Sequence, residues 1–158
     1  MQNVVRALHE AAVLLTAARP LTVDAFGKRL RRYLASNHSY EVAGPDFPGT
    51  WMAGGCYLLA HALKAVLGPD AEIVGVGTDV APLDHVVVKY AGRYLDADGA
   101  SSLPELLHKM ETVEHRPNPR LVPVRGVPAD FYFEKAISAA LQDAIIAKVG
   151  RIGGGGAS

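Results

Sequence analysis

Apolar residues recur at three- and four-residue spacing in five stretches of the chain, and this period is typical of amphipathic helices. The stretches cover residues 4–18, 22–36, 56–67, 102–110 and 128–149. Thr22 is the expected N-cap of the second helix, and Ser101 or Ser102 is the expected N-cap of the fourth. Gly68-Pro69 ends the third helix, because glycine and proline commonly follow a helix C-terminus.

Runs rich in valine and isoleucine predict β-strands between these helices. The expected strands cover residues 72–77, 84–90, 93–98 and 121–125. Ala91-Gly92 is a candidate for a two-residue turn, which predicts a hairpin in which Tyr90 pairs with Arg93. Because helices precede and follow the strands, the order of elements predicts an α+β fold.

The length of 158 residues fits one domain, which we expect over residues 1–150. Residues 151–158 are rich in glycine and are expected to form a flexible tail or to be an expression remnant. Residues 37–53 contain several glycines and prolines and are expected to form a loop that leads into the third helix. Loops of this length are often functional, so this segment is a candidate wall of a cleft.

The charge balance narrows the classes of partner. Lys+Arg and Asp+Glu both number 16, so nothing favours nucleic acid or an anionic membrane as a partner. The basic run in residues 28–32 is expected to be a solvated helix face. We find neither a secretory signal pattern nor an apolar run of roughly 20 residues, so the sequence predicts a soluble cytoplasmic protein. It predicts no cofactor and no metal.

Cys56 is the only cysteine and follows Gly54-Gly55, a pair that suits a tight turn. The helical pattern begins at this cysteine, so Cys56 is expected in the first turn of a helix. There the unpaired backbone N–H groups and the positive end of the helix dipole favour a thiolate, which is the nucleophilic form of the side chain. The alternative is a small buried apolar residue, because cysteines that form no disulfide are commonly buried.

A nucleophilic thiol needs a base and a group that orients the base, and His85 is the candidate base because it opens a valine-rich strand. The Ala91-Gly92 turn places His85 opposite Asp98 and makes Asp96 its diagonal neighbour on the same face of the sheet. Either carboxylate could fix the tautomer of the ring. Two alternatives stay open: the aspartates serve the turn before Gly99, or Cys56, His85 and an aspartate bind zinc.

Three segments together resemble the core of the papain-like and transglutaminase-like cysteine enzymes, particularly small phage and bacterial members. They are Gly54-Gly55-Cys56 on a helix, Asp84-His85-Val86-Val87-Val88, and Tyr94-Leu95-Asp96-Ala97-Asp98-Gly99. The resemblance implies a cysteine helix packed on an antiparallel sheet with flanking helices. It also implies Cys56 as nucleophile, His85 as base and Asp96 as orienting residue, with Asp98 as a rival for the last role.

The resemblance further implies a thiol peptidase or amidase that acts on a protein, peptide or amide through a thioester. Alternatives are transfer of the acyl group to an amine, or a binding module on the same fold without turnover. Trp51 and Gly55 are candidates for the cleft wall or the oxyanion hole, and Trp51 is also a candidate core anchor. No glutamine precedes Cys56 by a few positions, which departs from papain.

Overall fold

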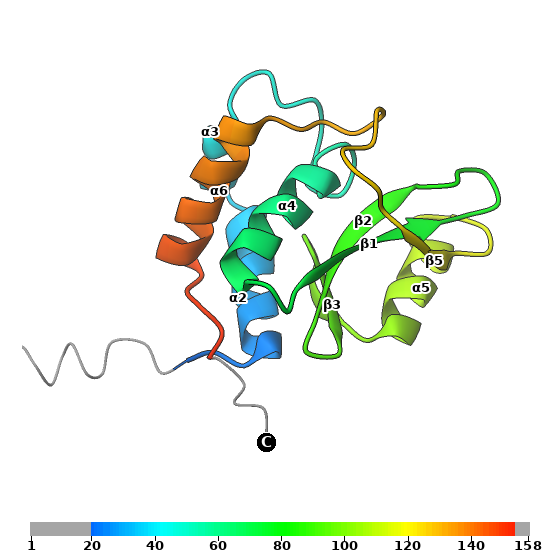
Figure 1. Ribbon diagram of the computed structural model, residues 1–158, viewed down its shortest axis with the longest axis horizontal. Coiled ribbons are helices and arrows are strands. Elements are labelled where there is room, and N and C mark those ends of the chain that lie inside the picture. The colour runs from blue at the N-terminus through cyan, green and yellow to red at the C-terminus, as the bar shows by residue number, and fades with distance from the viewer. Residues whose placement is uncertain (1–19, 154–158) are drawn as a thin grey trace, which may run out of the picture.

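The computed structural model describes residues 20–153, which contain five helices and five strands (Figure 1). In chain order these elements are α2 (Val23–Leu34), α3 (Asn37–Ala43), α4 (Cys56–Leu67), β1 (Glu72–Gly77), β2 (His85–Tyr90), β3 (Arg93–Asp96), β4 (Gly99–Ser101), α5 (Leu103–Thr112), β5 (Arg120–Pro123) and α6 (Lys135–Lys148). The strands form one sheet in the order β4-β3-β2-β1-β5, and all neighbours are antiparallel. The predicted α+β fold is confirmed.

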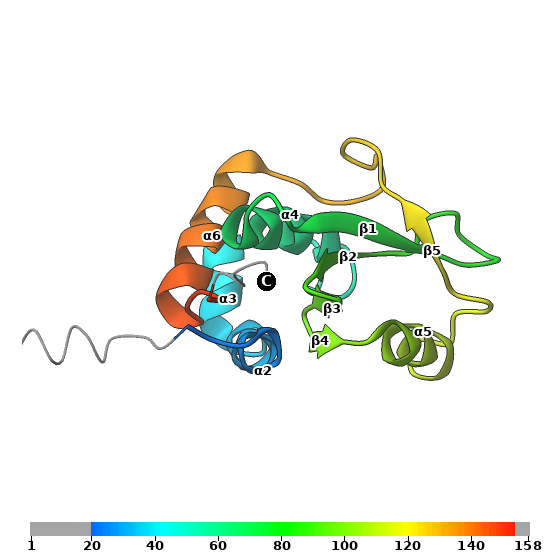
Figure 2. The same cartoon turned by 60° about the horizontal axis from the view of Figure 1, so that its bottom comes forward.

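The sheet separates two apolar cores. Val86, Val88 and Leu95 belong to the larger core, which also contains residues of α2, α4 and α6. Val87 and Tyr94 belong to the smaller core, together with residues of α5. Successive side chains of a strand point to opposite faces, so β2 and β3 contribute to both cores in turn. Figure 2 shows α5 apart from the other four helices, beyond β3 and β4.

The hairpin of β2 and β3 has the predicted register. Tyr90 pairs with Arg93, and Val88 pairs with Leu95. Ala91 and Gly92 form the turn with φ angles of 47° and 73°. Two positive φ angles are typical of a type I′ turn, whose twist matches that of the strands.

The second half of this hairpin differs from the prediction, because β3 ends at Asp96 rather than continuing to Asp98. Asp98 lies in a second turn, where its N–H donates to Asp96 Oδ1 at 2.9 Å. Gly99 then begins β4 with a φ of 106° and pairs with Asp96. The predicted pairing of His85 with Asp98 is therefore wrong, because the chain reverses before Asp98 can extend the ladder.

Two expectations outside the sheet were also wrong. Residues 37–53 are not all loop, because Asn37–Ala43 form α3, which ends at Gly44 with a φ of 82°. The last helix begins at Lys135 rather than near residue 128, because the preceding aromatic residues pack inward instead of continuing a helix. Phe133 lies against the rings of Tyr57 and His61, at centroid distances of 5.5 and 4.8 Å.

The ends of the described chain lie side by side. The Leu21 N–H donates to Arg151 O at 3.2 Å, and the Gly153 N–H donates to Leu21 O at 3.3 Å. Residues 151–153, assigned to a tail from sequence, therefore pair with the start of the structure. The predicted helix over 4–18 and residues 154–158 lie outside the described residues. Within residues 20–153, every helix is too short or too polar to cross a membrane.

Candidate active site

Cys56 is the first residue of α4, as predicted, and the loop before it is tightly bonded. The Gly55 N–H donates to Thr50 O, and the Thr50 N–H donates to Ala53 O, both at 3.0 Å. Gly54 has a φ of 91°, a conformation that few residues other than glycine adopt. This loop fixes the start of α4, so the Cys56 amide lies in the first turn, where N–H groups have no partner within the helix. Cys56 itself is only 2% exposed.

His85 is the first residue of β2 and is also 2% exposed. Its Nε2 lies 3.1 Å from Asp96 Oδ2, which leaves Nδ1 as the ring nitrogen available to Cys56. Burial alone would lower the pKa of His85. Hydrogen bonds with the side chains of Asp96 and Cys56, and the Coulombic attraction of both, outweigh burial and raise the pKa from 6.5 to about 9. The ring is therefore an imidazolium at neutral pH.

Asp96 is held by three groups at the end of β3. Its Oδ2 accepts hydrogen bonds from His85 and from Lys109 Nζ, the latter at 2.6 Å, while its Oδ1 accepts the Asp98 N–H. Burial would raise the pKa of Asp96, but the His85 hydrogen bond and the positive charges of Lys109 and His85 keep it below its usual range. Asp96 is therefore a carboxylate, and it orients the His85 ring.

Lys109, on α5, is a member of this cluster that the sequence analysis missed. Its Nζ contacts Asp96 and also lies 3.2 Å from Asp98 Oδ2. The only sequence signal is its position three residues after Leu106, near the apolar face of the helix. The spacing does not show that this face lies against the strand that carries Asp96.

The remaining predicted site residues lie around this cluster without contacting His85 through a hydrogen bond or ion pair. Asp98 has a 43% exposed side chain and pairs with Lys109. Trp51 is buried, and its Nε1–H donates to Ser39 Oγ at 2.9 Å, so it packs as a core anchor. The Gly55 N–H is likewise bonded to Thr50. Neither the indole N–H of Trp51 nor the Gly55 N–H is therefore available to bind a substrate.

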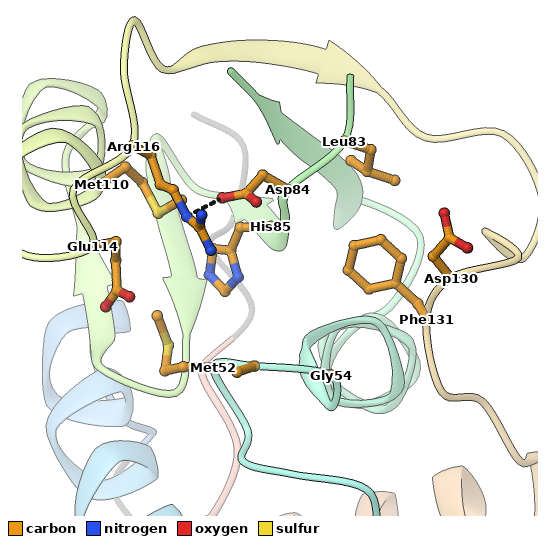
Figure 3. A pocket seen from close by; sticks show the side chains of 11 residues that line it. Met52, Gly54, Leu83, Asp84, His85, Met110, Glu114, Arg116, Asp130 and Phe131 are labelled. Atoms are coloured by element: carbon orange, nitrogen blue, oxygen red, sulfur yellow. Dashed lines mark ion pairs between the residues drawn. The ribbon is translucent and has the colours of Figure 1, made fainter. Parts of the chain in front are cut away.

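A hollow of about 290 Å³ opens beside His85 (Figure 3). Met52 and Gly54, from the loop before Cys56, border it. Asp84 and Arg116 also line it and form an ion pair at 3.0 Å. The contribution of the loop before Cys56 was expected from the sequence. Arg116 was not, because it lies in an irregular segment with no motif.

The cluster brings together the kinds of side chain that acid–base and nucleophilic chemistry use. Within residues 20–153, no three His, Cys, Asp or Glu side chains are arranged to hold a metal ion. A thiol, an imidazole and a carboxylate in series are the groups that nucleophilic catalysis requires. Comparisons of the chain with protein-family models, curated proteins and solved structures find no match.

Proposed function

We propose that this protein is a cysteine-dependent acyl-transfer enzyme that hydrolyses a peptide or amide bond. One observation carries the proposal: the buried His85 ring is bonded through Nε2 to Asp96 at 3.1 Å, and the Cys56 side chain is among the groups that raise the pKa of the ring. Perturbed titratable groups linked in this way occur preferentially at functional sites. The hollow beside His85 provides space for a substrate next to the cluster.

The proposed reaction has two halves, formation of a thioester on Cys56 and its hydrolysis, and His85 transfers a proton in each. The Cys56 thiolate attacks the carbonyl carbon, and the carbonyl electron pair moves to the oxygen, near the Cys56 N–H. The tetrahedral intermediate collapses, the C–N bond breaks, and the leaving amine takes the proton of the His85 imidazolium. A water molecule then loses a proton to His85 and attacks the thioester, releasing a carboxylic acid and the Cys56 thiolate. If an amine replaces the water, the same steps transfer the acyl group.

The order of elements agrees with the resemblance to papain-like and transglutaminase-like enzymes. A helix that begins at Cys56 is followed by an antiparallel hairpin that carries His85 and Asp96. We therefore propose that α4 and the sheet form a core of that type.

The reactivity of Cys56 with iodoacetamide tests the proposal. We expect the folded protein to be alkylated faster than cysteine in solution at pH 6 to 7, because an adjacent imidazolium favours a thiolate. Substitution His85→Ala should slow alkylation by about a hundredfold, the lower end of the effects that positioned acid–base partners have. His108→Ala is the matched control, because His108 is exposed on α5 and does not line the hollow.

His85→Asn is a second variant that keeps a polar side chain of similar reach, in case His85→Ala unfolds. Circular dichroism establishes that each variant is folded before its rate is compared. The proposal fails if folded wild-type protein reacts no faster than cysteine in solution and both His85 variants react at the same rate. Turnover is then sought with fluorogenic peptide and amide substrates, which the Cys56→Ser variant should not cleave.

The burial of Cys56 favours a second candidate, a binding module that uses the hollow without turnover. In that case the Cys56–His85–Asp96 chain would hold the loop and strand ends in place. This candidate predicts that Cys56 reacts with iodoacetamide only at the rate at which the protein opens. The two candidates differ in the pH dependence of alkylation, since only an activated pair keeps its reactivity below pH 7.

A further inference from the structure

The hollow beside His85 combines apolar walls with acidic side chains. Five of its lining residues are apolar, namely Met52, Ala53, Leu83, Met110 and Phe131. Its charged lining residues apart from His85 are three acids and one base: Asp84, Glu114, Asp130 and Arg116. The lining therefore carries more negative than positive charge, although the whole chain has a formal net charge of zero.

The single base among them is already paired. Arg116 Nε lies 3.0 Å from Asp84 Oδ2, so these two charges largely compensate each other. Glu114 and Asp130 form no ion pair with any residue in the part of the chain that the structure describes. They extend from different segments on opposite sides of the His85 ring (Figure 3). Because they do not converge on one point, they suit an extended cationic ligand better than a metal ion.

The charged groups behind His85 do not cancel the net negative charge of the hollow. The charge of the imidazolium is compensated by Asp96, and that of Lys109 is shared between Asp96 and Asp98. The C-terminal end of α5, near Met110, adds the negative end of a helix dipole to the same side of the hollow. A positive charge is therefore favoured in the hollow, beside the His85 ring.

We infer that the substrate carries a lysine or arginine side chain beside the carbonyl group attacked by Cys56, an inference that rests on the proposed function. Lysine and arginine have an aliphatic stem that packs on apolar surface and a charged head that seeks a carboxylate. Met52, Leu83 and Phe131 suit the stem, and Glu114 and Asp130 suit the head. Phe131 can also contact a cation through its ring face.

Charged thiol reagents test this inference without any knowledge of the substrate. Methanethiosulfonates react with a thiolate to form a mixed disulfide, and methanesulfinate leaves. The aminoethyl reagent is cationic, the sulfonatoethyl reagent is anionic, and the methyl reagent is neutral. Because Cys56 is the only cysteine, mass spectrometry follows its modification directly.

For each thiol we compare the rate of modification by the cationic reagent with the rate by the anionic reagent. At low salt we expect this ratio to be about tenfold higher for Cys56 than for 2-mercaptoethanol, because two carboxylates attract the cationic reagent across partly aqueous space. The ratio should fall towards that of 2-mercaptoethanol at about 0.5 M salt, because screening then acts over a few ångströms. The double variant Glu114→Gln/Asp130→Asn should lower it, and Arg116→Gln should raise it, because Asp84 then loses its partner.

The double variant Asp70→Asn/Glu72→Gln is the matched control. It removes the same amount of charge from exposed residues that do not line the hollow, so the ratio should stay at the wild-type value. If the neutral reagent modifies Cys56 but the ratio equals that of 2-mercaptoethanol, the inference is overturned and the proposed function stands. The inference is also overturned, and the proposed function stands, if both double variants lower the ratio equally. If the neutral reagent leaves folded protein unmodified, the proposed function and this inference are both overturned.

Discussion

Replacing Asp96 with asparagine should change the proton affinity of His85 more than any other single substitution at a neighbouring residue. Asp96→Asn keeps the shape of the side chain but removes the negative charge 3.1 Å from His85 Nε2. In the wild-type protein, the pKa of His85 rises from 6.5 to about 9. That change corresponds to roughly 3 kcal/mol in favour of the imidazolium, since a tenfold change in an ionisation constant is about 1.4 kcal/mol.

Two effects act together once the carboxylate is gone. Burial, which lowers the pKa of His85, is no longer balanced by Asp96, and the positive charge of Lys109 then has only Asp98 as a partner. We therefore expect the pKa of His85 in Asp96→Asn to fall by at least about 2, a hundredfold change in proton affinity. Histidine NMR titration between pH 5 and 10.5 measures it directly, and Asp98→Asn is the matched control, because Asp98 has no hydrogen bond to His85.

The same shift sets how stability depends on pH. Because the pKa of His85 is higher in the folded than in the unfolded chain, its stabilising contribution is complete below about pH 6.5. This contribution is lost as the pH rises through about 9. Urea denaturation should therefore show that wild-type protein loses up to about 3 kcal/mol more than Asp96→Asn between pH 6 and 10. The reasoning is refuted if His85 in Asp96→Asn still titrates near pH 9, or if Asp98→Asn lowers its pKa equally.

Three further substitutions have expected outcomes. Lys109→Met should raise the pKa of His85 above its wild-type value, because the carboxylate charge is then shared with no other cation, and NMR titration would detect the rise. Gly27→Ala should cost about 1–3 kcal/mol in urea denaturation. The added Cβ would meet Ala100 N at 2.5 Å, where α2 crosses β4. Ser102→Ala should cost about 1 kcal/mol in the same assay, because it removes the N-cap of α5.

Helix caps and the hairpin turn were predicted correctly from sequence, because they depend on residues that are close together along the chain. Thr22 and Ser102 cap helices as expected, because the cap uses an oxygen within three residues of the bonded N–H. The Ala91-Gly92 turn fixed the register of β2 and β3, because a two-residue turn leaves little choice of pairing. The positions of Cys56 at the start of a helix and of His85 at the start of a strand were likewise predicted from the apolar residues that follow each of them.

The errors come from contacts between residues far apart in the sequence. The apolar period continued back through Phe133, but this residue packs on Tyr57 and His61 rather than on a helix face. Lys109 has an ordinary helical environment in the sequence, and only tertiary packing brings it to Asp96. The choice of Asp96 over Asp98 as the partner of His85 likewise depended on a second turn, which neither residue type alone determines.

The buried charges give a reason to expect chemistry at this site rather than added stability. His85, Asp96 and Lys109 follow one another with alternating charge, and the first two are almost fully buried. A buried ion pair is seldom more stabilising than well-packed apolar residues of the same volume, because desolvation offsets the attraction. The sheet already has Val87 and Tyr94 on this face, and further apolar side chains would extend that core at no electrostatic cost. A histidine and an aspartate at these positions therefore support the role proposed for them beside Cys56 better than a purely structural one.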